Sequence, residues 1–99
     1  MAPESGFSWI RAEERLCSYS KENGYKVCFC ADCGSPMPNK FRNFPLYGVP
    51  AGSIDDDSGV SVIARIYLGS RAKWDKDKFE GAGFLEMPAL GEMLELLHL

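Results

Sequence analysis

Hydrophobic and polar residues alternate most clearly in the second half of the chain. The apolar set on alternate positions comprises Val60, Val62, Ala64, Ile66 and Leu68. This period of two predicts a β-strand over residues 60–68, with one apolar face. A second strand is predicted over residues 25–30, because the Asn23-Gly24 pair before it favours a tight turn.

Helical spacing is confined to two short segments. Leu90, Met93, Leu94 and Leu97 recur at helical intervals, which predicts a short amphipathic helix over residues 89–97. Residues 11–16 are good helix formers but long enough for only one or two turns. Prolines at 36, 38, 45 and 50 exclude a helix there and confine pairing to short, edge-like strands within residues 40–49. The pattern predicts a mainly β protein with a short C-terminal helix.

The remaining segments carry loop signals. Residues 51–59 include three adjacent aspartates, Asp55 to Asp57, which we interpret as a solvated turn because calcium ligands alternate along a loop. Residues 73–78 form a charged surface segment with one aromatic side chain. Gly81-Ala82-Gly83 predicts a sharp bend.

Composition narrows the class of protein. A chain of 99 residues predicts one domain over residues 1–99. Its formal net charge of −3 argues against a broad electrostatic grip on nucleic acid or on an anionic membrane. The N-terminus lacks a basic and apolar leader, and no run of about 18 apolar residues follows. We therefore expect a cytoplasmic protein that contacts neither membrane nor nucleic acid.

Three of the four cysteines lie within six residues, at Cys28, Cys30 and Cys33. In a reducing compartment, clustered cysteines are more often metal ligands or reactive thiols than disulfides. The Cys30-x-x-Cys33 pair can bend around one ion, and Gly34 permits the positive φ that such a knuckle needs. On a strand, Cys28 shares a face with Cys30, so it is either a third ligand or a small apolar strand residue.

Structural zinc takes four ligands, and two thiolates supply only half of them. The site can be completed by Cys28, by Cys17, by His98 or by a second chain. We expect Cys17 to be a buried small residue, and His98 to be an exposed residue near the C-terminus. A Cys30/Cys33 pair from each of two chains would make four thiolates, and that arrangement requires a dimer.

Aromatic and basic residues outside the cysteine cluster have two interpretations. Trp9, Tyr19, Tyr67 and Trp74 either line a small-molecule cleft or pack in the core. We expect core packing for most of them, with Trp74 the most exposed. Arg65 and Lys73 either meet a substrate carboxylate or are solvated surface charges.

The order of several short motifs resembles a known family. The motifs are Phe7-x-Trp9, Leu16-x-x-Tyr19, Phe29-Cys30-x-x-Cys33-Gly34-Ser35, Ala51-Gly52-Ser53-Ile54-Asp55, Ile66-Tyr67, Ala72-x-Trp74 and Pro88. Over roughly residues 7 to 88 the chain is similar to the glutathione-dependent formaldehyde-activating enzyme family, which includes centromere protein V. The resemblance implies a small zinc-binding, mainly β fold of the β-tent type, here truncated.

The chain departs from that family in its cysteines. Family members carry a Cys-x-Cys pair and a Cys-x-Cys-x-x-Cys triple before the region matched here; the pair joins the later Cys-x-x-Cys in a structural zinc site, and the triple holds the catalytic zinc. Only Cys30 and Cys33 carry over, as half of the structural site. Cys28-x-Cys30-x-x-Cys33 has the spacing of the catalytic triple, which keeps a three-thiolate zinc open as an alternative. The flanking Gly34-Ser35 favours the structural assignment.

Two functions follow as hypotheses. The resemblance implies a carbon–sulfur lyase that joins glutathione, as co-substrate, to formaldehyde, with catalysis impaired or absent because the catalytic cysteines are missing. The alternative is a non-catalytic metal-binding or interaction module that acts as a homo-oligomer, most simply a dimer, with a small-molecule thiol as a further candidate ligand. Exposed strand edges left by truncation would favour such pairing.

Overall fold

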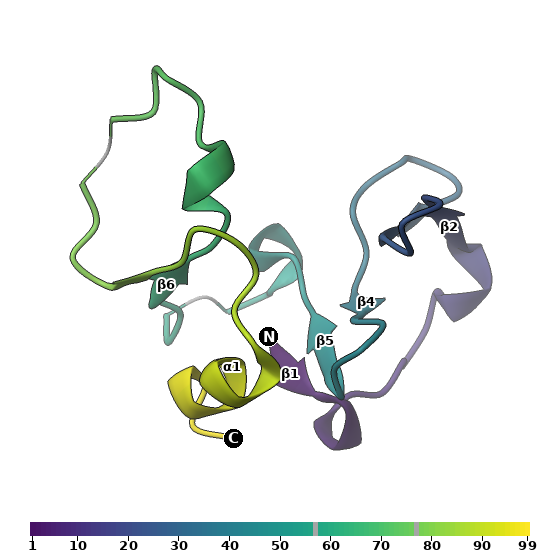
Figure 1. The fold of residues 1–99 in the computed structure, drawn as a ribbon. Coiled ribbons are helices and arrows are strands. Elements are labelled where there is room, and N and C mark those ends of the chain that lie inside the picture. Colours follow the sequence, from purple (N-terminus) through teal and green to yellow (C-terminus); the bar gives the residue numbers. More distant parts are fainter. Residues whose placement is uncertain (57, 77) are drawn as a thin grey trace. The chain divides into compact units, whose positions relative to one another are not determined.

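The computed structural model describes residues 1–56, 58–76 and 78–99, and it divides the chain into two compact units, Met1–Asp57 and Ser58–Leu99. We call them the N-terminal unit and the C-terminal unit and describe each by itself. Small β-sheets and one short C-terminal helix make up the regular structure, as the hydrophobic pattern predicted (Figure 1). The single domain expected from chain length stays a prediction.

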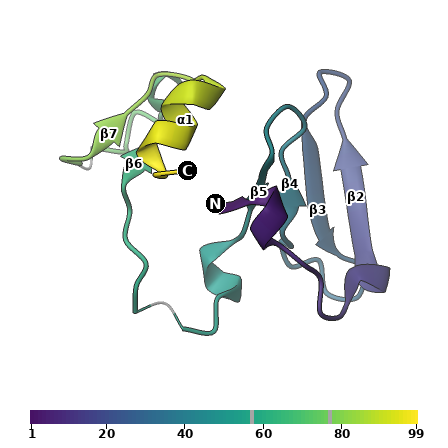
Figure 2. The ribbon, with the colours of Figure 1, turned by 90° about the horizontal axis from the view of Figure 1, so that it is seen from below.

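The N-terminal unit contains a hairpin and a three-stranded sheet (Figure 2). Strands β2 (Leu16–Ser20) and β3 (Lys26–Cys30) pair antiparallel, with Cys17 opposite Phe29 and Ser18 opposite Cys28. The second sheet has the order β1-β5-β4, from β1 (Ala2–Pro3), β5 (Leu46–Gly48) and β4 (Asn39–Lys40). The predicted strand at 25–30 and the predicted short strands within 40–49 are therefore confirmed.

Turn chemistry sets the hairpin register. Gly24 has a φ of 88°, and its N–H donates to the Lys21 carbonyl at 2.9 Å. The Lys21 N–H donates in turn to the Tyr25 carbonyl at 2.7 Å, which closes the loop between β2 and β3. A side chain at Gly24 would be strained at this φ, so the glycine is required by the turn.

The core of the N-terminal unit is formed by Leu46 and a short stack of rings. Leu46 lies on the central strand β5 and is fully buried. Phe7 stacks on Tyr47, the next residue of β5, with ring centroids 4.0 Å apart, and meets the edge of Trp9 at 5.3 Å. These side chains hold a small sheet together through apolar burial and ring contacts.

The C-terminal unit is built on a pair of very short parallel strands, β6 (Ala64–Arg65) and β7 (Ala82–Gly83). After β6, the 3₁₀ turn η4 (Leu68–Ser70) hydrogen-bonds back to residues 84–85, through Leu68 N–H to Phe84 O and Gly69 N–H to Leu85 O, both at 3.0 Å. Helix α1 (Leu90–Leu96) follows and buries Met93. The helix predicted at 89–97 is confirmed to within a residue at each end.

Two predictions about secondary structure are wrong. The strand expected over residues 60–68 forms only at Ala64–Arg65, because Tyr67 adopts a φ of 57° and the chain turns into η4. The helix expected over residues 11–16 is reduced to one 3₁₀ turn, Glu13–Arg15, before Leu16 enters β2. The bend expected at Gly81-Ala82-Gly83 is present at Gly81, and the two residues after it form strand β7.

Exposure also corrects several side-chain predictions. Cys17, expected to be buried, is exposed on β2. Tyr19 and Tyr67 are 61% and 52% exposed, so core packing is wrong for these two, while Trp9 is half-buried. Trp74 is 84% exposed and is the most exposed of the four, as expected. His98 is exposed, as expected. Of the aspartate turn, Asp55 and Asp56 lie in an exposed loop, and Asp57 lies outside the described residues.

No helix among the described residues has the length and apolar character needed to cross a bilayer.

Candidate metal knuckle

The candidate metal-binding residues lie at the end of β3 and in the loop that follows it. Backbone hydrogen bonds fold residues 30–35 into a closed loop: the Gly34 N–H donates to Cys30 O at 2.8 Å, and the Cys30 N–H donates to Ser35 O at 2.9 Å. Gly34 has a φ of 76°, the left-handed conformation that the sequence predicted for a knuckle. We call residues 30–35 the knuckle.

Three further contacts hold the knuckle and the residues beside it in the N-terminal unit. The Ala31 N–H donates to Arg15 O at 2.8 Å, and the Arg15 guanidinium forms an ion pair with the Asp32 carboxylate. On the other side, the Met37 N–H donates to Cys28 O at 3.1 Å, which extends the pairing of β3 beyond the loop. The thiols of the knuckle are therefore presented by a loop that is hydrogen-bonded at both ends.

The knuckle brings Cys30 and Cys33 together. Cys30 is half-buried and Cys33 is exposed, and both thiols are free. The Cys33 thiol lies 3.2 Å from the Ser35 hydroxyl. Hydrogen bonding from the Ser35 hydroxyl, and then from the Ser35 backbone N–H and the Cys30 thiol, lowers the pKa of Cys33. Since metals bind cysteine as thiolate, this environment suits a ligand.

Cys28 occupies a different environment. Its side chain is 7% exposed, and its thiol donates to Asn39 Oδ1 at 3.2 Å. Asn39 is itself anchored, because its Nδ2 donates to Lys26 O at 2.7 Å. The buried thiol thus behaves as a small, hydrogen-bonded strand residue, which is one of the two roles that the sequence left open for it.

The remaining candidate ligands lie elsewhere. Cys17 is exposed on β2 opposite Phe29, while the cysteines of β3 pair with Leu16 and Ser18. His98 belongs to the C-terminal unit. In the part of the chain that the structure describes, no three His, Cys, Asp or Glu side chains gather closely enough to hold a metal ion. Of the candidate ligands, the structure thus brings together Cys30 and Cys33.

An open groove borders the knuckle inside the N-terminal unit. It has a volume of about 560 Å³ and is lined mainly by apolar groups from β3, the knuckle and the segments that follow the knuckle and β5, including Val27, Cys28, Phe29, Gly34, Met37 and Val49. No local sequence signal indicates this groove, because its walls come from residues up to 49 positions apart in the chain, Met1 to Pro50. It adds apolar surface beside the cysteines.

Replacing Gly34 by alanine is expected to destabilise the N-terminal unit by about 1 kcal/mol, because an L-residue is disfavoured at positive φ. A Cβ at Gly34 would meet no atom within 4 Å, so the penalty is conformational and not steric. Urea denaturation of Gly34→Ala measures it. Gly52→Ala is the matched control, since a Cβ there also meets nothing within 4 Å and its φ is not in the left-handed region. Equal unfolding free energies for the two variants would contradict the conformational requirement for glycine at position 34.

Comparisons of the chain with models of protein families, with curated proteins and with solved structures found no match.

Proposed function

We propose that this chain is a non-catalytic, zinc-binding module of the formaldehyde-activating enzyme type, in which the knuckles of two copies share one zinc ion. The observation that carries the proposal is the knuckle itself. Cys30 and Cys33 lie together on a closed loop with Gly34 at positive φ, and the second thiol is exposed to solvent. This is the arrangement in which a Cys-x-x-Cys pair supplies half of a tetrahedral thiolate site.

A second copy is the simplest source of the missing ligands. Four thiolates complete a structural zinc site, and two knuckles related by a two-fold axis supply four. The exposure of Cys33 supports this arrangement, since a ligand to a shared ion must lie at the protein surface. Zinc, when bound, would crosslink the two chains and stabilise both loops.

The free edge of the hairpin also supports association. Among the described strands β2 pairs only with β3, so its other edge carries unpaired backbone groups. Four of its five residues are exposed, including Tyr19. Because unpaired strand edges readily add another strand, the surface around the knuckle suits contact between copies.

Carbon–sulfur lyase activity is the second candidate, and it rests on the family resemblance alone. The resemblance maps no residue of this chain onto the catalytic cysteine triple. The one arrangement that would restore such a site, a zinc on Cys28, Cys30 and Cys33, requires Cys28 to leave its buried position and its hydrogen bond to Asn39. Breaking that contact would cost about 1 kcal/mol or more.

We therefore expect the zinc-loaded protein to consume formaldehyde in the presence of glutathione no faster than glutathione alone does. Formaldehyde loss is followed by a colorimetric assay at several protein concentrations, with the Cys30→Ser/Cys33→Ser variant as the matched control. A rate that rises in proportion to protein concentration, and that this variant abolishes, would contradict the non-catalytic assignment and favour the lyase.

A further inference from the structure

The C-terminal unit gathers its positive charge around two adjoining cavities. The first, of about 640 Å³, is lined by Arg71, Lys73, Lys76 and Lys78 together with Leu68, Ala72, Asp75 and Phe79. The second, of about 350 Å³, is lined by Arg65, Tyr67, Arg71 and Trp74 together with Ile66, Leu68 and Asp75. Every lysine and arginine of residues 58–99 lines one of these two cavities.

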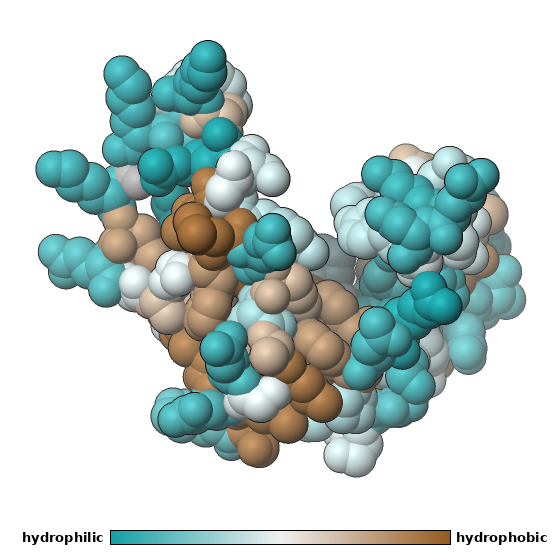
Figure 3. Space-filling view, viewed as in Figure 1, coloured by the Kyte–Doolittle hydropathy of each residue, from teal (hydrophilic) through white to brown (hydrophobic). Residues whose placement is uncertain are grey.

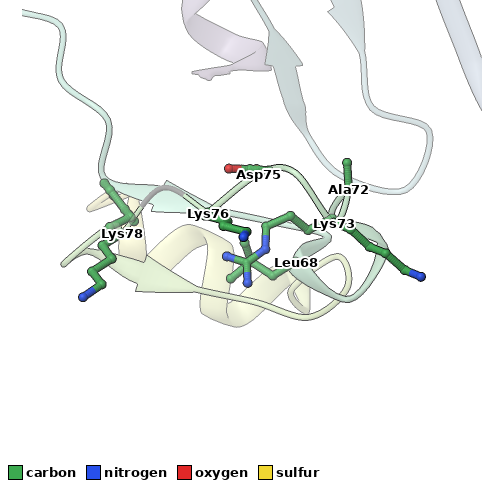
Figure 4. Close-up of a pocket in the computed structure, with 8 residues that line it drawn as sticks. Leu68, Ala72, Lys73, Asp75, Lys76 and Lys78 are labelled. Atoms are coloured by element: carbon green, nitrogen blue, oxygen red, sulfur yellow. The ribbon is translucent and has the colours of Figure 1, made fainter.

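The first cavity is bordered by charge on several sides. Figure 4 shows Lys76 directed toward the middle of the cavity, with Lys73 and Lys78 extending at opposite ends of it. Figure 3 shows hydrophilic side chains projecting from the same segment, at the upper left of the view. Asp75 is the one carboxylate among the described lining residues.

Local backbone structure holds this cluster in place. The Asp75 N–H donates to Ala72 O at 3.0 Å and the Arg71 N–H donates to Leu68 O at 3.2 Å, so residues 68–75 form two successive turns. The Arg65 guanidinium lies over the Phe79 ring, 5.4 Å from its centroid, which connects strand β6 to the far wall of the first cavity. Like charges brought together in this way repel one another, and a bound anion would relieve that repulsion.

The second cavity adds two aromatic rings to the charged groups. Tyr67 and Trp74 are 52% and 84% exposed on its walls, although burial of such large rings is normally favourable. Arg71 lines both cavities and joins the aromatic pair to the basic cluster. A ligand that spans both would place a ring beside Trp74 and its anionic groups near Arg71 and Lys76.

From this arrangement we infer that the two cavities form one binding site for a nucleoside di- or triphosphate. Guanidinium and ammonium groups bind phosphate oxygens, and exposed aromatic rings stack on bases. Each cavity has a volume within the range of pockets that hold small molecules. The proposal is independent of the zinc knuckle, since all of its residues belong to the C-terminal unit. The sequence showed this segment only as a charged surface stretch with one aromatic.

Fluorescence titration of Trp74 tests the proposal. The full chain has two tryptophans, so Trp9→Phe leaves Trp74 as the single reporter. We expect ADP and ATP to quench it saturably, and we expect both pyrophosphate and adenosine to bind more weakly than ADP. Added potassium chloride should weaken ADP binding, because the charged groups are exposed. No saturable signal with ADP or ATP at millimolar concentration, in fluorescence and in calorimetry, would overturn the proposal.

Charge substitutions locate the site. Arg71→Gln/Lys76→Gln is expected to weaken ADP binding by about tenfold or more, the scale of one lost hydrogen bond between charged groups. Arg11→Gln/Lys26→Gln removes the same two charge types from exposed positions of the N-terminal unit and should leave binding unchanged. If both double variants weakened ADP binding equally, the loss would be explained by net charge alone, and the proposed site would be overturned. Pyrophosphate binding as tight as ADP binding would overturn the role of the rings.

Discussion

Serine at both positions 30 and 33 is expected to abolish zinc binding and to convert the protein from a dimer to a monomer. The two knuckle thiols are the proposed protein ligands in each copy, and serine hydroxyls do not replace thiolates on zinc. Because structural zinc contributes directly to the stability of small domains, the variant should also unfold at a lower urea concentration than the zinc-loaded wild type. Elemental analysis and sedimentation velocity measure the first two effects.

Two single substitutions serve as matched controls for that result. Cys17→Ser removes an exposed thiol on β2 and should leave zinc content and mass unchanged. Cys28→Ser replaces the buried thiol that donates to Asn39, and it should keep zinc while testing the three-thiolate alternative. Loss of zinc in Cys28→Ser with retention of its folded circular dichroism would show that Cys28 is a ligand and that the shared site is wrong.

The second substitution from which we expect a large effect, here on stability, is at Leu46. Replacing this fully buried residue by alanine should lower the free energy of unfolding of the N-terminal unit by about 3 kcal/mol, from lost apolar burial and the cavity left behind. The free energy of unfolding of a typical domain is about 5–15 kcal/mol, so this loss is a large fraction of it. Few other side chains can take the place of Leu46 in this sheet, because Cys28 is the one other buried residue among the described residues of the N-terminal unit.

Urea denaturation followed by Trp9 fluorescence, in a Trp74→Phe background, measures this loss in the unit that contains Leu46. Ile10→Ala is the control, because Ile10 is 94% exposed and its truncation should change stability by less than about 0.5 kcal/mol. Similar losses for Leu46→Ala and Ile10→Ala would show that β5 is not the centre of a packed core.

Local signals predicted the parts of the fold that depend on neighbouring residues. The Asn23-Gly24 turn and the strand before Cys30 form as expected, since turn chemistry and alternation act within a few residues. Helix α1 forms where Leu90, Met93, Leu94 and Leu97 recur at helical spacing. The Cys30-x-x-Cys33-Gly34 knuckle likewise follows from a glycine that accepts positive φ.

The longest predicted strand failed for a tertiary reason. Alternation at residues 60–68 is typical of a segment that can pair along its whole length, but among the described strands its only partner is the two-residue strand β7. Without a longer partner Val60 and Val62 stay exposed, at 53% and 69%, and the positive φ of Tyr67 ends the extended segment. Propensity in a strand is realised only through packing and pairing with neighbours.

For the site residues too, local sequence predicted one part and the tertiary structure decided the rest. Spacing identified Cys30 and Cys33 as a pair, but it could not separate them from Cys28, because residues two apart on a strand share a face whatever their partners. The separation comes from Asn39, eleven residues away, which accepts the Cys28 thiol hydrogen bond. The basic cavities of the C-terminal unit were missed because the fold, and not the sequence order, places Arg65 beside Phe79.

Native mass spectrometry, combined with elemental analysis of protein purified without chelator, tests whether two knuckles share one zinc ion. We expect a dimer mass that includes one zinc ion for two chains, and a shift to monomer when a chelator removes the zinc. A monomer that carries one zinc ion per chain, or a dimer that persists without zinc in either measurement, would contradict the shared site.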